Sequence, residues 1–387
     1  MATTADVIVV GAGIVGAACA LSLQQAGQNV LLFDAATPGS AVTAAGMGHL
    51  VVLDESAHEL ELCLHSLRLW QEFLARRPQF QDVYRCGTLW VAENEQQLAA
   101  AEARANALNQ HDWSAELLRG ADLYRAEPAL RPGLPGAVRV LHDMVVYPPA
   151  LAALMVQEFT QLGGRFVGHC AITQLQTGAL RDQSGAIHYA PQIVIAAGLE
   201  VPRLLADIPI FGRKGHLAIT ERYPGTLRHQ VVSMNYGQAN MQADALVVAA
   251  NIQPRPTGQW LIGSCRQDQQ TNLQIDTAAL VAVLRSAQTL LPCLAEMRIL
   301  RSWAGMRPAS PDGHPIIGPH PERKGIWLAA GHEGLGVTTA LASAEMLTQQ
   351  MLGSKTTLDT TCYLPQRFFQ SSARPEAQAV GSSGEQA

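Results

Sequence analysis

The chain has 387 residues and a formal net charge of −5, with 27 Lys and Arg against 32 Asp and Glu. This length predicts two or three structural units with a large buried core, and a hydrophobic fraction of 48% is ordinary for a globular enzyme. Because the chain carries no basic excess that could hold nucleic acid or an anionic membrane by charge, we expect neither as a partner.

The seven cysteines stand far apart, and no two of them form a CxxC pair. The spacing predicts neither a zinc site nor an iron–sulfur cluster, so we expect no metal, and scattered thiols fit a reducing compartment. Residues 1–8 run directly into a predicted strand, and no apolar stretch reaches about 18 residues. We therefore expect no signal peptide, no membrane span and a cytoplasmic location.

The chain begins with a strand, a glycine-rich turn and a helix. Residues 6–10 form a short β-branched run that is typical of a buried parallel strand. The sequence Gly11-Ala-Gly-Ile-Val-Gly16 follows and leads into a predicted helix over 17–26. Glycines in this spacing permit a tight turn, the approach of a pyrophosphate and close packing of helix on strand, and the helix N-terminus attracts phosphate.

A second strand is predicted over 29–33, and Asp34 ends it. Asp34 lies 18 positions after Gly16, where an acidic side chain can accept hydrogen bonds from a ribose diol. Ala35 and Ala36 follow instead of Arg or Lys, which argues against a 2′-phosphate. The whole unit predicts a dinucleotide site.

The remaining elements follow from their periodicity. Helices are predicted over 55–80, 95–120, 150–162, 276–291 and 337–351. Strands are predicted over 86–92, 165–167, 171–176, 186–189, 192–198, 216–221, 245–251, 260–263 and 326–330. Strands of the nucleotide-binding type occur at the start, the middle and the end. The fold class is therefore α/β mixed with α+β, a discontinuous Rossmann-like domain that carries an inserted antiparallel-sheet domain, and residues 370–387 are expected to be a disordered tail.

Six segments carry a resemblance to a known family. They are Val7–Asp34, Gly39–Gly48, Ile193–Gly198, Trp303–Pro308, Ser310–Gly318 and Gly331–Thr338. Together and in this order they resemble the D-amino-acid oxidase/glycine oxidase/sarcosine oxidase family of FAD enzymes. Within that family, the residues of these segments are most similar to those of the flavin subunits of D-hydroxyproline dehydrogenases and opine oxidases.

The resemblance implies the domain boundaries and the reaction. An FAD-binding domain is expected over 1–80, 145–215 and 300–355, and a substrate domain over 81–144 and 216–299. The reaction implied is oxidation of an amino acid, a D- or cyclic secondary amine such as D-hydroxyproline. Hydride passes from the substrate Cα to flavin N5 and leaves an imine, so that the flavin supplies the redox chemistry.

The same resemblance implies which residues hold FAD. They lie in seven places: the first glycine-rich turn, the end of the second strand at 34–35, the small-residue loop after Gly39, position 171, the strand end near 197, the segment 305–307, and the glycine turn after 330. The residues so implied are Gly11, Ala12, Gly13, Ile14, Val15, Gly16, Asp34, Ala35, Ser40, Thr43, Ala44, Ala45, Gly46, Gly48, Ala171, Ala197, Gly198, Gly305, Arg307, Gly331, His332, Glu333, Gly334, Leu335, Gly336, Val337 and Thr338.

Three residues are expected to act on the substrate. Arg307 is implied to pair with the amino-acid carboxylate, for which the guanidinium fork is better suited than Lys. Glu333 could face a substrate hydroxyl or ammonium, or cap a helix, and Tyr236 is a pocket candidate from its loop position. His49 is either a pocket residue or a structural one. Residues 305–310 contain no Cys at the position where some relatives attach flavin, so FAD is expected to be non-covalent.

Three alternatives stay open at this point. A nicotinamide-dependent dehydrogenase would share the first glycine-rich turn but would leave the second, at 331–336, unexplained. A binding role with FAD as a structural element is the second. The third is a flavin subunit of a hetero-oligomer that acts on an opine, glycine or sarcosine. The electron acceptor expected is oxygen, a quinone or a partner redox subunit.

Overall fold

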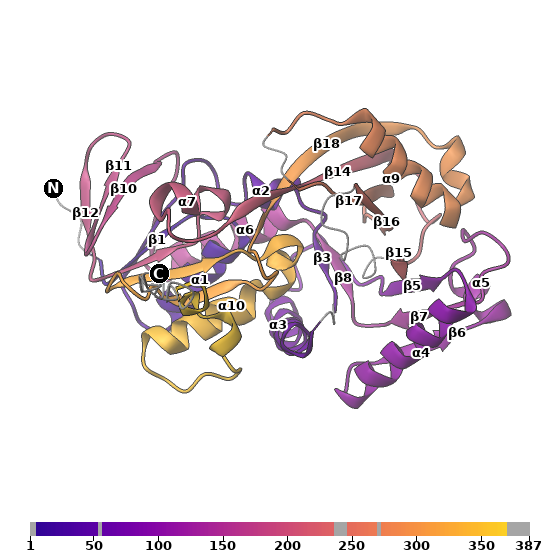
Figure 1. The fold of residues 1–387 in the computed structure, drawn as a ribbon, viewed down its shortest axis with the longest axis horizontal. Helices are drawn as coiled ribbons and strands as arrows, with labels where there is room; N and C mark the ends of the chain where they lie inside the picture. Colours follow the sequence, from indigo (N-terminus) through magenta and orange to yellow (C-terminus); the bar gives the residue numbers. More distant parts are fainter. Residues whose placement is uncertain (1–4, 53–55, 236–245, 269–271, 370–387) are drawn as a thin grey trace, which may run out of the picture.

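The computed structural model describes residues 5–52, 56–235, 246–268 and 272–369. The predictions for Tyr236 and for the tail at 370–387 lie outside these residues. Within them the chain forms two large sheets and two three-stranded ones, and the two large sheets lie at opposite ends of the long axis (Figure 1).

The first large sheet has six strands in the order β19–β20–β13–β1–β2–β9. They run parallel except for β19, which is antiparallel to β20. The strands are β1 (Val7–Val10), β2 (Val30–Phe33), β9 (Arg165–Val167), β13 (Gln192–Ile195), β19 (Ile316–Pro319) and β20 (Ile326–Ala330). Every residue of β1 and β2 is buried, as expected for parallel strands covered on both faces. The predicted parallel strands are thus confirmed.

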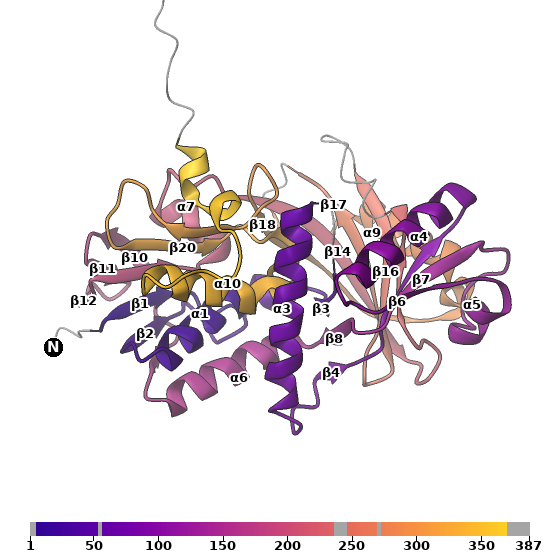
Figure 2. The same cartoon turned by 90° about the horizontal axis from the view of Figure 1, so that it is seen from below.

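Helices cover one face of this sheet, and a small sheet covers the other (Figure 2). The helices are α1 (Ile14–Gln25), α6 (Pro148–Gln161) and α10 (Gly336–Met351), while α3 (Ala57–Ala75) packs on α10. Helix α1 packs between α6 and α10, and α10 also contacts α3. The small sheet consists of β10 (Ile172–Gln176), β11 (Ala179–Asp182) and β12 (Ile187–Tyr189), and its Ile172 and Leu180 join the core beneath β1. This layering confirms the Rossmann-like arrangement.

The second large sheet has eight strands in the order β18–β14–β17–β16–β15–β5–β7–β6. The pairs are antiparallel except for β15 and β5, which run parallel. The strands are β5 (Thr88–Ala92), β6 (Ala115–Leu118), β7 (Gly136–Val140), β14 (Phe211–Arg222), β15 (Gln230–Ser233), β16 (Val247–Pro254), β17 (Gln259–Arg266) and β18 (Ile299–Ala309). The expected antiparallel sheet is therefore present, with one parallel pair in it.

Helix α9 (Thr277–Leu290) packs on β14, β16 and β17, while α4 (Glu95–Gln110) packs on β5, β6 and β7. Asp276 caps α9, because its carboxylate accepts from the amides of Ala278 and Ala279. A short α5 (Gly120–Ala126) follows β6. Between the large sheets lie α3 and a three-stranded sheet of β3 (His49–Leu50), β8 (Met144–Val146) and β4 (Val83–Tyr84) (Figure 2).

Two sequence predictions need correction. The helix predicted over 95–120 ends at Gln110, and the chain returns as strand β6, because the amide of Asn109 bonds to both backbone groups of Ala115 and turns the chain. The second correction concerns residues 300–355, which we assigned whole to the FAD-binding domain. Strand β18 instead pairs along its length with β14 in the eight-stranded sheet, so residues 299–309 belong to the second sheet. No helix among the described residues is both long and apolar enough to cross a membrane.

Candidate functional site

The first glycine-rich turn joins β1 to α1 and fits tightly against the end of β13. Gly11 has φ +107°, and a Cβ there would lie 2.4 Å from the carbonyl oxygen of Ala196. A Cβ on Gly16 would lie 1.9 Å from the carbonyl oxygen of Gly11. Gly13 is the N-cap residue of α1 and has no side chain that could cap the helix. The first turn of α1 therefore presents backbone N–H groups and a positive dipole end to a ligand.

Asp34 stands at the end of β2, beside this turn. Its Oδ2 accepts a hydrogen bond from the amide of Ala12 at 2.6 Å, and its Oδ1 accepts one from the amide of Ala36 at 2.8 Å. The carboxylate thus joins the glycine-rich turn to the segment after β2 while it lines the adjoining pocket. A ribose hydroxyl that donates to Asp34 would meet a side chain that is already oriented.

A second loop crosses the N-terminus of α1. It contains the short helix α2 (Val42–Ala45), and Thr43 Oγ1 accepts a hydrogen bond from the amide of Ile14 at 3.1 Å. The indole N–H of Trp303 on β18 donates to the carbonyl of Ala45 at 3.1 Å. A Cβ on Gly305 would lie 2.9 Å from the Cβ of Ala45, so only glycine lets β18 pass here. The loop therefore connects the two large sheets.

Two pockets meet along this loop. The outer pocket lies over the first glycine-rich turn, and the inner pocket lies between α2, β14, β18 and the glycine turn at 331–336. Ile14, Val42, Thr43, Glu333 and Gly336 line both, so the two form one continuous cleft.

The structure brings most of the predicted cofactor residues to this cleft. Those that line the outer pocket are Gly11, Gly13, Ile14, Val15, Asp34, Ala35, Ser40, Thr43, Ala171, Ala197, Gly198, Gly331, His332, Glu333 and Gly336. Those that line the inner pocket are Ile14, Thr43, Ala45, Gly46, Gly48, Gly305, Arg307, Glu333, Gly334, Gly336 and Val337. The other five do not line either pocket: Ala12, Gly16, Ala44, Leu335 and Thr338.

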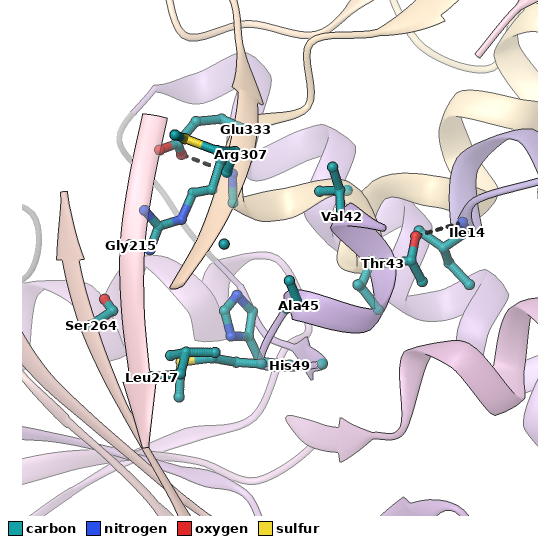
Figure 3. A pocket seen from close by; sticks show the side chains of 18 residues that line it. Ile14, Val42, Thr43, Ala45, His49, Gly215, Leu217, Ser264, Arg307 and Glu333 are labelled. Carbon is teal, nitrogen blue, oxygen red and sulfur yellow. Dashed lines mark hydrogen bonds between the residues drawn. The ribbon is translucent and has the colours of Figure 1, made fainter. Parts of the chain in front are cut away.

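Arg307 lies on β18 and reaches across β14. Its Nη1 donates to the carbonyl of Cys265 on β17 at 3.1 Å. A Cβ on Gly215 would lie 2.8 Å from Nη1 and 2.9 Å from Nη2, so the glycine makes room for the guanidinium. Figure 3 shows the side chain beside Gly215 at one wall of the inner pocket. This placement suits a bidentate bond to a carboxylate.

Glu333 begins the short turn η4 (Glu333–Leu335), just before α10. Its Oε2 accepts from the amide of Gly334 at 2.9 Å, and its Oε1 lies 3.5 Å from Arg213 Nη1 and 3.5 Å from Arg266 Nε. Burial raises the pKa of Glu333, but the positive charges of Arg266, Arg307 and Arg213 and the Gly334 N–H bring the pKa below its ordinary value. Glu333 is therefore a carboxylate at neutral pH, and it does not act as the helix cap we considered, because no side chain caps α10.

Two histidines of the cleft stay neutral. His49 on β3 lines the inner pocket, and burial, with a contribution from the charge of Arg307, lowers its pKa to about 4. Its Nδ1 lies 3.4 Å from the side-chain nitrogen of Gln253. His332 lines the outer pocket, lies 3.0 Å from the Ser343 hydroxyl, and has its pKa lowered to about 4 by burial. Neutral imidazoles here provide hydrogen bonds without charge.

Sequence reasoning missed several residues of the inner pocket. Met47, Gly215, Leu217, Ser264 and Met306 line it, and none of them was predicted. Side chains alternate between the two faces of strand β14, so Gly215 and Leu217 lie on the same face. This two-residue period is visible in the sequence and could have indicated that the two residues belong together. It did not show which face meets the glycine turn.

Comparison with known proteins agrees with this geometry. Residues 6–350 match the family described as FAD dependent oxidoreductase. The chain is 26% identical to a glycine oxidase of Bacillus licheniformis, covering 90% of this chain and 93% of that one. It is 25% identical to the hydrogen cyanide synthase subunit HcnC of Pseudomonas aeruginosa, covering 98% and 99%. The structure of L-proline dehydrogenase from P. horikoshii superposes with a TM-score of 0.83 at 21% identity, covering 95% of this chain and 99% of that one.

The cleft fits FAD on its own features. The N-terminus of α1 suits a pyrophosphate, and Asp34 suits a ribose. A Cβ on Gly13 would lie 3.2 Å from Thr43 Oγ1, so the glycine lets the 42–45 loop lie close to this turn. The N-terminus of α10, which has no side-chain cap, faces the inner pocket, where it would stabilise negative charge on a reduced flavin. The chain belongs to the FAD-dependent oxidoreductase family and is a flavoenzyme.

Proposed function

We propose that this flavoenzyme oxidises an amino acid, a D- or cyclic secondary amine such as D-hydroxyproline, at the bond between Cα and nitrogen. The observation that carries the proposal is the place of Arg307. Its guanidinium lies over Gly215 at the wall of the inner pocket, next to the glycine turn that leads into α10. An amino acid held there by its carboxylate would present its Cα toward the cofactor side of the cleft.

The roles of the chain's residues follow from the geometry. FAD, bound non-covalently, would supply the hydride acceptor; the hydride would leave Cα once the substrate nitrogen has lost a proton to water, and the product would be an imine. Arg307 binds and orients the substrate carboxylate, and Asp34 with the α1 N-terminus holds the ADP part of the cofactor. Gly305 and Ala45 pack together and close the space between β18 and α2. Tyr236 remains a candidate for the substrate side.

A second candidate is a glycine, sarcosine or opine oxidase or dehydrogenase that works as one subunit of a hetero-oligomer. Two relatives, a glycine oxidase and a subunit of hydrogen cyanide synthase, favour it. The electron acceptor would then be a partner redox subunit; otherwise it is oxygen or a quinone. We also propose a cytoplasmic location, which the wide spacing of the seven cysteines along the chain supports.

One experiment separates these candidates. The purified holoenzyme is mixed anaerobically with a panel of D- and L-amino acids, prolines, hydroxyprolines, glycine, sarcosine and opines, and loss of the flavin absorbance is recorded. Fast bleaching by D-hydroxyproline or another cyclic secondary amine supports the first candidate. Bleaching by glycine, sarcosine or an opine alone supports the second. A colourless protein, or a flavin that none of these compounds reduces, would overturn both.

A further inference from the structure

Glu333 has a backbone conformation that a glutamate rarely adopts. Its φ is +47°, in the left-handed region where residues other than glycine are strained. Its neighbours Gly331 and Gly334 show that glycine is used freely in this turn. A strained residue with a long charged side chain at such a position indicates that the side chain has a role.

The side chain is buried and ionised, with only 12% of its surface exposed. Arg213 from β14 and Arg266 from β17 each approach Oε1 to 3.5 Å, and Arg307 from β18 adds a third positive charge nearby. These three charges outweigh burial and hold the pKa of Glu333 below its ordinary value. The group is therefore an anion inside a positively charged wall.

One of its two oxygens is incompletely satisfied. Oε2 accepts the amide of Gly334 at 2.9 Å. Oε1 is buried, and within the described part of the chain no donor reaches it with hydrogen-bond geometry. Buried carboxylate oxygens without a donor are costly, so a ligand that brings an N–H to this point would bind favourably.

Arg307 lies directly beside Glu333. A Cβ built on Gly334 would lie 3.7 Å from both Cδ and Nε of Arg307, and Figure 3 shows Glu333 and Arg307 next to each other on the same side of the pocket. In an amino acid the carboxylate and the nitrogen are bonded to the same carbon. A carboxylate held by Arg307 therefore brings the nitrogen close to Glu333.

We propose that Oε1 of Glu333 accepts a hydrogen bond from the protonated nitrogen of the substrate, so that Arg307 and Glu333 together bind amino acids as zwitterions. This inference rests on the proposed function, and it names the form of substrate that the site selects. A carboxylic acid that has no nitrogen on Cα, or that has a neutral donor instead of the ammonium, would make the contact with Arg307 but not the charged contact with Glu333.

The test uses three ligands that have no hydrogen on Cα and so cannot be oxidised: α-aminoisobutyrate, 2-hydroxyisobutyrate and trimethylacetate. They share one shape and carry an ammonium, a hydroxyl or a methyl group at the same position. Each is titrated into the holoenzyme while the flavin absorbance and the heat of binding are recorded. Wild-type protein should bind α-aminoisobutyrate more tightly than the other two, on the order of tenfold to a hundredfold.

Glu333→Gln keeps the shape and removes the charge. It should weaken the binding of α-aminoisobutyrate and strengthen that of trimethylacetate, because the Glu333 carboxylate no longer opposes the attraction of Arg266 and Arg307 for a plain carboxylate. Glu322→Gln, an exposed glutamate on the loop before β20, is the matched control and should change neither. Glu333→Asp retains the charge on a shorter side chain, so it should keep the affinity for trimethylacetate while losing part of the preference for the ammonium.

The outcomes are distinguishable. Equal binding of all three ligands to wild type, or parallel changes in all three in Glu333→Gln, overturns the role of Glu333 and leaves the proposed function intact. If 2-hydroxyisobutyrate binds as tightly as α-aminoisobutyrate, Oε1 of Glu333 accepts a hydrogen bond from any donor. That result would overturn the proposal that the site selects a charged nitrogen. If none of the three binds wild type, the carboxylate site at Arg307 fails and the proposed function fails with it.

Discussion

The guanidinium of Arg307 occupies the space above Gly215 on the neighbouring strand. The two residues lie on β18 and β14, and a Cβ at position 215 would come within 2.8 Å of Arg307 Nη1. The residue directly opposite Arg307 is Arg213, whose charge Asp268 balances through two hydrogen bonds of 2.7 and 3.1 Å. Arg307 is thus directed away from a like charge and into the pocket, and the absence of a side chain at 215 makes this possible.

Gly215→Ala should therefore disturb substrate binding without removing any charge. The added methyl displaces the guanidinium, so we expect KM for the best substrate to rise about tenfold while flavin content stays normal. Glu221→Ala on the same strand is the control, because the side chain of Glu221 is exposed. Steady-state kinetics of both variants measure the two KM values. Equal KM values would contradict the placement of the Arg307 guanidinium over Gly215.

Arg307→Ala should be more severe. Removing one partner of a buried charge pair costs about 3–5 kcal/mol, which corresponds to roughly a hundredfold to several-thousandfold in kcat/KM. Arg307→Lys keeps the charge but loses the fork, and should fall between wild type and Ala. Stopped-flow reduction of the bound flavin measures both, with Arg222→Ala, exposed at the end of β14, as the control. Reduction of Arg307→Ala at the wild-type rate would show that another residue holds the carboxylate.

Asp34→Ala should yield protein that is largely free of flavin. The change removes an acceptor for the ribose and also the hydrogen bonds to the amides of Ala12 and Ala36. Hydrogen bonds to a charged group are worth about 1.5–3 kcal/mol each. The flavin-to-protein ratio after purification, and the Kd for added FAD, measure the loss. Glu61→Ala on the exposed side of α3 should retain full flavin, and a normal ratio in Asp34→Ala would place the ribose elsewhere.

Asp143 gives a prediction for pH. Burial raises the pKa of its carboxyl to about 7, against the lowering effects of Thr88 and Arg104. The folded state then holds a proton that the unfolded state releases near pH 4, so this group lowers stability as pH rises from about 4 to about 7. Asp143→Asn removes this dependence. Relative to wild type, the variant should gain more than about 1.4 kcal/mol between pH 5 and pH 8, the value of one pKa unit.

Denaturant unfolding at both pH values in excess FAD measures this difference. The exposed Asp122→Asn on α5 is the control and should show no change with pH relative to wild type. A constant difference between Asp143→Asn and wild type at the two pH values would mean that Asp143 is ionised in the folded protein.

Much of the cofactor half of the site was predictable from local sequence. The turn at Gly11–Gly16 and the acid at Asp34 belong to one strand–turn–helix–strand unit, in which short-range steric limits fix the backbone. The strands over 165–167 and 326–330 were also predictable from local sequence, and the structure reproduces their predicted bounds. The helix predicted over 95–120 was too long because residues 115–118 favour a helix by composition, whereas the side chain of Asn109 turns the chain and these residues form β6.

The substrate half depended on contacts between segments that are distant in sequence. The sequence by itself identified Arg307 and Glu333, through their resemblance to a family, but not their neighbours. Only the tertiary structure placed Arg213, Arg266 and Gly215 around them, and it moved β18 into the second sheet. The physical reason is register: a strand presents opposite faces with a period of two, and which face meets which loop is set by pairing between strands almost a hundred residues apart, which no local pattern encodes.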